Sequence, residues 1–333
     1  MKHVIPFDMP HPLVPKEDYF QIGREVGGGE FLQASKLGFF PMAKSIWRQD
    51  VHAHGRGLPF PEMCGFFAKR SIYTPHNNFI GTRWWIKKIR AFMFNRYTVV
   101  IAQTPYGQRN YAKDGINPKR IRLQPIPVDY RFFSRPKGGR AFRRRFGLGN
   151  RPFALCNGAR VSKNADVIME ACRKAGIAVV FIAPRSLEEV HGYPWLLPPK
   201  VVLDAQGKDV IVTGKLQAKD VLAALDAATI YINSADDGGE CFSLVVYEAA
   251  SAGVPLCLPD FGVFEAFNNC ALFHNNHDPG QLAENLKKYL RNPGLRRCNA
   301  AKAKKVASGF DYPIIRKQYE KLYNEVFGPA SIR

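Results

Sequence analysis

The sequence has few features of a secreted, disulfide-stabilised or membrane-spanning protein. Its seven cysteines are odd in number, scattered and never arranged as CxxC, which fits neither a disulfide framework nor a cysteine zinc site. No stretch approaches the ~18 consecutive apolar residues of a membrane span. The first residues, MKHVIPFDMPHPLVPKED, lack the apolar core of a secretion signal. We therefore expect a soluble, cytoplasmic protein in a reducing compartment.

Acidic side chains are scarce in the first 150 residues, which contain 9 Asp and Glu against 26 Lys and Arg. This half carries +17 of the total net charge of +20, and the rest of the chain carries only +3. A charge of one sign on one part of a protein attracts anionic partners, whereas a charge that serves only solubility would be spread evenly. The first half is therefore expected to bind an anionic acceptor or surface.

Short β-rich runs alternate with helical patterns along all 333 residues, which predicts an α/β protein with two parallel sheets. A chain of this length favours two domains. We expect a basic N-terminal Rossmann-like domain over 1–135 and an interdomain linker over 136–150 that runs into a short basic helix. A C-terminal Rossmann-like domain is expected over 151–333, and its last helix can cross back to the first domain. Two such domains that face each other would place a ligand in the cleft between them.

The segment from 236 to 265, DDGGECFSLVVYEAASAGVPLCLPDFGVFE, carries the strongest chemical pattern. Ser243 is a predicted N-cap, the following residues have helical spacing, and Gly253 with Pro255 predicts the end of the helix. The helix therefore opens directly after a Gly-rich loop. Its free backbone N–H groups and the positive end of its dipole would hold a phosphate.

Glu240 and Glu248 flank the start of this predicted helix. Glu240 lies three residues before Ser243, and Glu248 lies five residues into the helix, roughly 7 Å from its start at ~1.5 Å rise per residue. One carboxylate can therefore accept hydrogen bonds from a sugar and the other from a ribose, with a diphosphate between them. The alternative is that Glu240 only supports the helix and Glu248 is a solvated helix residue.

The stretch Glu240-Cys-Phe-Ser-Leu-Val-Val-Tyr-Glu248 resembles the E-x7-E signature of glycosyltransferase family 4, the glycosyl transferases group 1 type, which has the GT-B fold. The usual form has Gly where this chain has Cys241 and Ser243. The resemblance implies a nucleotide diphosphate sugar donor, UDP- or GDP-linked, and retention of configuration without a catalytic metal or other cofactor. It also implies a set of donor contacts, made by Glu240, Phe242, Ser243, Leu244 and Glu248.

Further segments are similar to the same family. NGARVSKNADVIMEA (157–171) resembles the loop whose two cations grip the donor diphosphate, which implies Arg160 and Lys163, although their spacing is shorter than usual. Such cations would stabilise the charge of the leaving diphosphate. Solvated loop cations are the alternative. HDPGQLAENL near residue 280 and QPIPVDYRFF (124–133) resemble segments that close the two domains.

In the first half the resemblance implies that His76 positions the donor sugar, with a structural histidine as the alternative. Gly28 and Gly29, in a triplet followed by Glu30 and a helical pattern, match a turn that would approach the donor phosphates. His52 and His54 form an HxH pair. No third ligand lies near them along the sequence, and Asp236-Asp237 is not a DxD arrangement, so no metal site is predicted.

The resulting prediction is a retaining hexosyltransferase with an acceptor on its basic N-terminal domain. Residues 81–97, GTRWWIKKIRAFMFNRY, combine aromatic and cationic side chains as membrane-surface helices do. They equally fit a buried amphipathic helix. A lipid-linked saccharide or glycan, at the cytoplasmic membrane face, is the preferred acceptor. The alternatives are glycosylation of nucleic acid at a modified DNA base, and a non-catalytic polyanion-binding protein on a GT-B scaffold.

Overall fold

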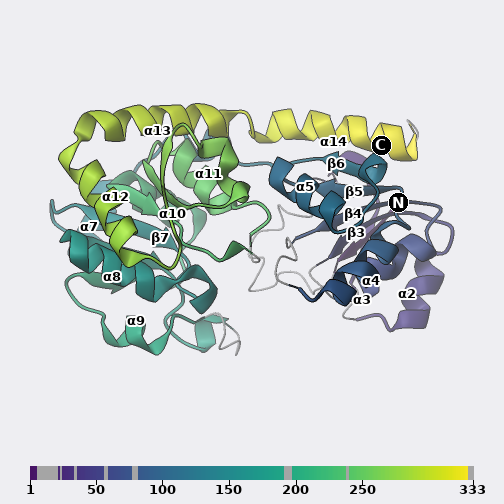
Figure 1. The fold of residues 1–333 in the computed structure, drawn as a ribbon, viewed down its shortest axis with the longest axis horizontal. Helices are drawn as coiled ribbons and strands as arrows, with labels where there is room; N and C mark the ends of the chain where they lie inside the picture. Colours follow the sequence, from purple (N-terminus) through teal and green to yellow (C-terminus); the bar gives the residue numbers. More distant parts are fainter. Residues whose placement is uncertain are drawn as a thin grey trace. The chain divides into compact units, whose positions relative to one another are not determined.

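A computed structural model describes residues 1–5, 22, 25–33, 36–55, 59–76, 82–190, 197–237 and 240–328. It divides into a first unit of residues 1–127, 237–242 and 312–333, and a second unit of residues 128–236 and 243–311. Each unit contains one six-stranded parallel sheet with helices packed on it (Figure 1), which confirms the predicted α/β class. Within these described ranges, no helix is both long and apolar enough to span a membrane.

The first sheet has the strand order β2-β1-β3-β4-β5-β6, and its strands pair in parallel. Its strands are β1 (Lys2–Ile5), β2 (Glu30–Gln33), β3 (Asp50–Gly55), β4 (Arg70–Pro75), β5 (Val99–Ala102) and β6 (Ile121–Leu123). The helices of this unit are α2 (Phe39–Ile46), α3 (Pro59–Met63), α4 (Trp84–Phe94), α5 (Pro105–Lys113) and α14 (Tyr312–Phe327).

The two faces of the first sheet differ in chemistry. Alternate strand residues such as Val4, Val51 and Tyr73 point to one face, where they form an apolar core with side chains of α2, α4 and α5. Figure 1 shows α2, α3 and α4 on this side of the sheet. The opposite face carries buried histidines, and Tyr323 of α14 lies against it.

The second sheet has the order β12-β11-β10-β7-β8-β9, again with parallel pairs. Its strands are β7 (Phe153–Asn157), β8 (Ala178–Ile182), β9 (Val210–Val212), β10 (Ile230–Ile232), β11 (Leu256–Pro259) and β12 (Ala271–His274). Its helices are α6 (Tyr130–Phe133), α7 (Gly139–Arg145), α8 (Ala165–Ala175), α9 (Lys200–Asp204), α10 (Ala218–Ala227), α11 (Leu244–Ser251), α12 (Pro279–Arg291) and α13 (Pro293–Ser308).

Helices α12 and α13 of the second unit begin at residues whose side chains cap them. Asp278 accepts hydrogen bonds from the backbone N–H groups of Gly280 and Gln281 at the start of α12, and Asn292 caps α13 in the same way. The amphipathic faces of α8 and α12 then pack on β7, β8 and β10 and on each other (Figure 1). This buried core keeps the loops at the carboxyl ends of β7 and β10 in fixed positions.

Three local features differ from the sequence predictions. The residues after Gly29 form strand β2, so the helical pattern predicted there is wrong, and β12 was not among the predicted strands. The predicted linker 136–150 contains α7, which packs against α10 within the second unit. The backbone N–H of Gly139 donates to Asp226 Oδ2 at 2.8 Å, so this segment is an integral part of that unit.

Candidate active site

The second sheet changes its strand order between β7 and β10. These strands are neighbours, but the chain continues from β7 to β8 on one side and from β10 to β11 on the other. Ligands of open parallel sheets bind outside the carboxyl ends of the strands at such a switch point. The loops that leave this point are 158–164 after β7 and 233–236 after β10.

Two cations lie in the loop after β7. Arg160 precedes a single 3-10 turn, Val161–Lys163, and is partly exposed. Lys163, the last residue of this turn, is only 7% exposed. It lies close enough to Arg160 for the two positive charges to repel each other. Burial, and after it the charge of Arg160, lowers the pKa of Lys163 to about 8, although Cys156 and Asp236 oppose the shift. The alternative of two solvated loop cations does not describe Lys163.

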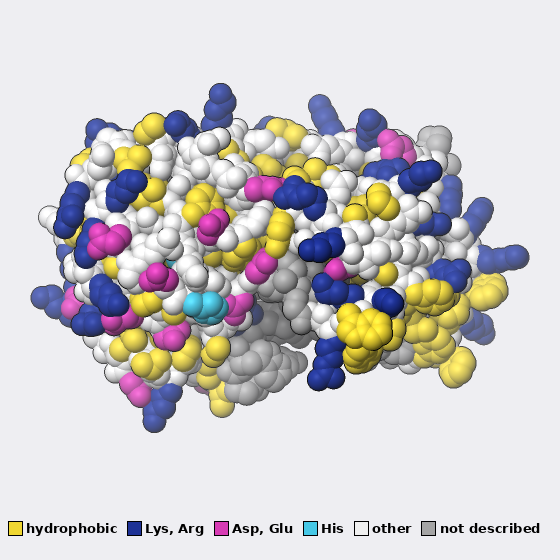
Figure 2. All heavy atoms as spheres, in the orientation of Figure 1, with side chains coloured by type: hydrophobic (Ala, Val, Ile, Leu, Met, Phe, Trp, Pro, Cys, Tyr) yellow, Lys and Arg dark blue, Asp and Glu magenta, His cyan; other side chains and the backbone are white. Residues whose placement is uncertain are grey.

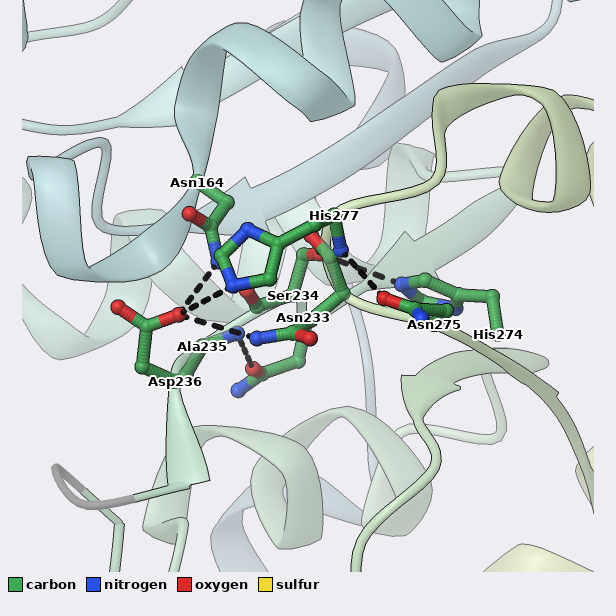
Figure 3. A network of polar contacts seen from close by, with 9 residues as sticks. Asn164, Asn233, Ser234, Ala235, Asp236, His274, Asn275 and His277 are labelled. Atoms are coloured by element: carbon green, nitrogen blue, oxygen red, sulfur yellow. Dashed lines mark hydrogen bonds and ion pairs between the residues drawn. The ribbon is translucent and has the colours of Figure 1, made fainter. Parts of the chain in front are cut away.

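Asn164 joins the two loops (Figure 3). Its backbone is left-handed, with φ of 49°, a conformation that Asn adopts more readily than most residues. Its side-chain amide donates to the Ser234 carbonyl at 2.7 Å and to Asp236 Oδ1 at 2.9 Å. The backbone N–H of Asp236 in turn donates to the Ser162 carbonyl at 3.1 Å. The cation loop is therefore fixed to the end of β10.

The segment after β12 completes this polar network (Figure 3). Asn276 donates to Asp236 Oδ1 at 3.0 Å, and its carbonyl accepts from the Ser234 hydroxyl at 3.0 Å. His277 Nε2 lies 3.5 Å from Asp236 Oδ1. His274 Nε2 lies 3.3 Å from Ser234 Oγ, and burial lowers the pKa of His274 to about 4, so its ring is neutral. Asp236 thus joins the loops of three strands.

Helix α11 begins at the same edge of the sheet. Its N-cap is Ser243, as predicted, but no side-chain capping bond forms. The Ser243 hydroxyl instead accepts a hydrogen bond of 3.2 Å from the amide of Asn233, the residue directly after β10. The backbone N–H groups of the first helical residues, Leu244 and Val245, have no acceptor within the helix itself. They supply the donor groups and positive dipole end that favour a phosphate.

Both carboxylates of the E-x7-E pattern are buried. Glu248 lies in α11 and is 8% exposed, so it is not the solvated helix residue of the alternative interpretation. Glu240 is 9% exposed, and Phe242, between it and the helix, is also buried. The Gly-rich lead predicted before them, Gly238 and Gly239, lies outside the described residues.

Comparisons with known proteins agree with this arrangement. Residues 161–292, from the cation turn to the end of α12, match the model of the family "Glycosyl transferases group 1". No curated protein matches the chain significantly by sequence. HepE of Anabaena in complex with UDP-glucose superposes with a TM-score of 0.75 at 15% identity, over 98% of this chain and 100% of that one.

Two other solved structures have the same fold. A glycosyltransferase of Rickettsia africae gives a TM-score of 0.74 at 13% identity, covering 98% of each chain. Sucrose-phosphate synthase of Thermosynechococcus elongatus gives 0.66 at 14% identity, covering 90% of this chain and 82% of that one. This chain has the GT-B fold, and residues 161–292 resemble the group 1 glycosyltransferases. The fold expected from the sequence is thereby confirmed.

In this GT-B protein, His76 lies in the first unit, directly after β4. It is buried and stacked on His54, with His54 Nδ1 at 3.3 Å from its Nε2 and Gln103 Nε2 at 3.5 Å from its Nδ1. Both ring nitrogens therefore face polar groups of the protein. The predicted contact of His76 with a donor sugar stays a prediction.

Gly28 and Gly29 do not occupy the predicted position. They precede β2, whose first residue pairs with Lys2 at the start of β1, so they lie at the amino edge of the first sheet. A Cβ atom at Gly29 would lie 2.1 Å from the Met1 carbonyl oxygen, and the Gly28 carbonyl faces His3. Because ligands of parallel sheets bind at the carboxyl edge, this position does not favour the contact with the donor phosphates, which stays a prediction.

Several residues of the network were not predicted, and they are Asn164, Asn233, Asp236, His274 and Asn276. His274 is the last residue of β12, and the others closely follow a strand or a 3-10 turn in sequence. A polar residue directly after a buried strand was the available signal, because the carboxyl ends of parallel strands meet at one edge. It could not say which of these polar groups bond to one another.

Proposed function

We propose that the chain is a retaining, family 4-type glycosyltransferase that moves a hexosyl group from a UDP- or GDP-sugar onto a lipid-linked or glycan acceptor held by the basic first unit. The observation that carries this proposal is the meeting of Lys163, Arg160 and the start of α11 at the switch point of the second sheet. The UDP and UDP-glucose complexes of HepE, a protein with the same fold, support a uridine diphosphate donor.

The leaving group of this reaction is a nucleoside diphosphate, whose negative charge grows as the glycosidic bond breaks. In the proposed site the guanidinium of Arg160, the ammonium of Lys163 and the N–H groups of Leu244 and Val245 stabilise that charge. Fixed positive groups in a buried site need no solvent reorganisation during the reaction. They supply the electrostatic stabilisation that a bound metal gives in other transferases, so the proposal includes no catalytic metal.

In this proposal the two buried carboxylates, Glu240 and Glu248, bind separate parts of the donor. Glu248, inside α11, is assigned to the ribose hydroxyls, and Glu240, before the helix, to the hydroxyls of the transferred sugar. Phe242, Ser243 and Leu244 lie between them and would line the path of the diphosphate. Because the Ser243 hydroxyl already accepts from Asn233, its backbone rather than its side chain would contact the phosphate.

Retention follows in this proposal from attack on the same face that the diphosphate leaves. The bond from the anomeric carbon to the phosphate oxygen breaks, and the bond to the acceptor oxygen forms. The acceptor proton passes to the leaving diphosphate. Glu240 orients the sugar in this step and forms no covalent bond with it.

A surface of the first unit supports a membrane-bound acceptor. Helix α4 buries Ala91 and Phe94 in the core but exposes other apolar side chains, with Trp84 at 68% and Phe92 at 55% exposure. Its cations Lys87 and Arg90 pair with Asp114 at 2.8 Å and with Glu62 at 4.0 Å. The predicted alternative of a buried amphipathic helix accounts for the packed side of α4 but not for these exposed rings.

The exposed aromatic surface extends from α4 to α2 (Figure 2). We call it the aromatic surface; it consists of Phe40, Trp47, Phe66, Trp84, Trp85, Ile89 and Phe92. Lys88 lies over the Trp84 ring at 4.9 Å, and Arg96 over Phe92 at 4.8 Å. Aromatic rings beside cations suit the interface of an anionic bilayer, where rings insert at headgroup level and cations contact lipid phosphates.

Transfer activity is tested by incubating the protein with UDP-glucose, other UDP- and GDP-hexoses and a membrane lipid extract. The expected result is release of nucleoside diphosphate with formation of a glycolipid whose anomeric configuration, measured by NMR, equals that of the donor. Glu240→Gln is expected to reduce the rate strongly. An inverted product would disprove retention. No turnover of any nucleotide sugar by a folded protein that binds nucleotide would support the non-catalytic alternative.

Membrane binding is tested by sedimentation with vesicles of neutral lipid or of neutral lipid mixed with anionic lipid. Binding to the anionic vesicles only is expected, since each cation near an anionic surface contributes about 1 kcal/mol. The double variant Trp84→Ala, Trp85→Ala should lose binding. Val201→Ala removes an exposed apolar side chain of the second unit and should bind normally. Tighter binding to duplex DNA than to vesicles would favour the nucleic-acid alternative instead.

A further inference from the structure

Four buried histidines line one face of the first sheet, where its strand order changes direction. His3 lies on β1, His52 and His54 lie on β3, and His76 follows β4 directly. Strands β1 and β3 are neighbours, but the chain continues from β1 to β2 on the opposite side, so this is the switch point of the sheet.

The strand register brings three of these histidines together. His3 is the cross-strand neighbour of His52, and His54 lies two residues further along β3, on the same face. One ring nitrogen from each histidine lies within 4.8 Å of the other two. Zinc bonds to imidazole nitrogen at about 2.0–2.1 Å, so two nitrogens of a tetrahedral site lie roughly 3.4 Å apart. Small rotations of the three side chains would bring their nitrogens from the present separations to this distance.

The chemistry of the three side chains suits a metal ion. Burial holds the pKa of His52 and of His54 well below the usual value, and the neighbouring histidines add to this effect. The rings are therefore neutral, which is the form that coordinates a metal. A set of imidazole nitrogens without thiolates is typical of zinc and of its first-row neighbours.

Two of the histidines already make the contacts that orient metal ligands. His3 Nε2 lies 3.1 Å from the Gly28 carbonyl and donates to it, so Nδ1 is the nitrogen available as ligand. His54 Nδ1 lies 3.3 Å from His76 Nε2, so Nε2 is the nitrogen of His54 on the other side of the ring from this contact. Ligating histidines commonly donate their other N–H to a carbonyl or another polar group, which fixes the tautomer and the ring orientation.

His52 is held between two hydroxyl groups. Its Nδ1 bonds to the Tyr323 hydroxyl of α14, and its Nε2 lies 2.7 Å from Thr74 Oγ1. Coordination through one nitrogen replaces one of these bonds and leaves the other to orient the ring. Because hydroxyl groups both donate and accept, either tautomer of His52 is satisfied.

We propose that His3, His52 and His54 bind one zinc-class divalent cation, which fastens β1 to β3 under α14. All three ligands belong to the first unit.

The test uses the full chain without an affinity tag of histidines. Zinc is removed with a chelator, and Zn²⁺ is titrated in competition with a chromophoric chelator, while Co²⁺ serves as the spectroscopic probe. We expect one Zn²⁺ per chain and a Co²⁺ visible spectrum of a four-coordinate site with nitrogen ligands. No saturable binding, or a six-coordinate Co²⁺ spectrum, would overturn the proposal.

Variants identify the ligands. His3→Gln and His54→Gln are expected to weaken Zn²⁺ binding by more than the ~10–100-fold that loss of an outer-shell partner causes. His277→Gln, which changes an exposed histidine of the second unit, should bind Zn²⁺ as the wild type does. Full binding by folded His3→Gln and His54→Gln would contradict the assignment. If circular dichroism shows that these variants do not fold, the Co²⁺ spectrum of the wild type alone tests the proposal, with the two outcomes given above.

Discussion

Raising the pH through 8 is expected to weaken the binding of UDP, because Lys163 loses its charge in that range. Its pKa of about 8 lies well below the usual 10.5, first because the ammonium is buried and then because Arg160 is close. Only the charged form attracts a diphosphate. UDP itself keeps its full charge above pH 7, since the second phosphate pKa is about 6.

The size of the effect follows from this pKa. At pH 7 about nine tenths of Lys163 is protonated in the free protein, and at pH 9 about one tenth is, so the apparent Kd should rise about tenfold. This corresponds to about 1.4 kcal/mol of binding free energy. Binding at pH 9 should therefore take up close to one proton per UDP, because the bound diphosphate restores the charge on the lysine.

Isothermal titration of UDP between pH 7 and 9.5 measures both quantities, with buffers of different ionisation heat for the proton uptake. Lys163→Arg is the matched control, since a guanidinium stays charged throughout and should remove most of the pH dependence. Lys163→Gln should bind weakly at every pH. A wild-type affinity that is constant over this range, or one that changes equally in Lys163→Arg, would refute the placement of Lys163 at the diphosphate.

Three further predictions concern stability. Asp236→Ala removes the acceptor shared by the loops of three strands and should lower the free energy of unfolding in urea by about 1–2 kcal/mol, a partial value because this carboxylate is half exposed. The His274 pKa of about 4 lies below the unfolded value of 6.5, so the unfolded state binds the proton first and stability falls as pH drops from 6.5 to 4. At pH 4.5 His274 should account for about 2–3 kcal/mol of that loss, and His274→Gln should reduce the loss by this amount. Gly139→Ala should cost about 1–3 kcal/mol, because a Cβ atom there would lie 2.9 Å from Asp226 Oδ2 and 3.0 Å from the Ala227 nitrogen; an unchanged melting curve would show that α7 does not pack on α10.

The sequence predicted the second unit well because its signals are local. A buried β-rich run, a Ser N-cap and a closing Gly mark β10 and α11 within a few residues of one another, and the structure confirms both elements. The hydrogen bond from Asn233 to Ser243 could not be predicted, because both side chains have several plausible partners along the chain. Short, partly exposed β2 carries no clear alternating pattern, which explains why a helix was expected there.

The first unit shows the limit of sequence spacing more clearly. His52 and His54 were recognised as an HxH pair, and no third histidine lies near them along the chain. The parallel register sets His3, almost fifty residues earlier, directly beside His52. Cross-strand neighbours in a parallel sheet are separated by whole crossover connections, so only the strand order reveals them. The same reasoning applies to α4, whose exposed aromatic face cannot be distinguished from a buried one by periodicity.

Titration of UDP and of UDP-glucose into the wild type and into Glu248→Gln, at pH 7, tests the central claim most directly. The account predicts one saturable site per chain for a uridine or guanosine diphosphate, with affinity reduced at least about tenfold in the variant, since a carboxylate that accepts hydrogen bonds is lost. If neither a uridine nor a guanosine diphosphate binds to the folded wild type, the assignment of the second unit as a nucleotide-sugar site is contradicted.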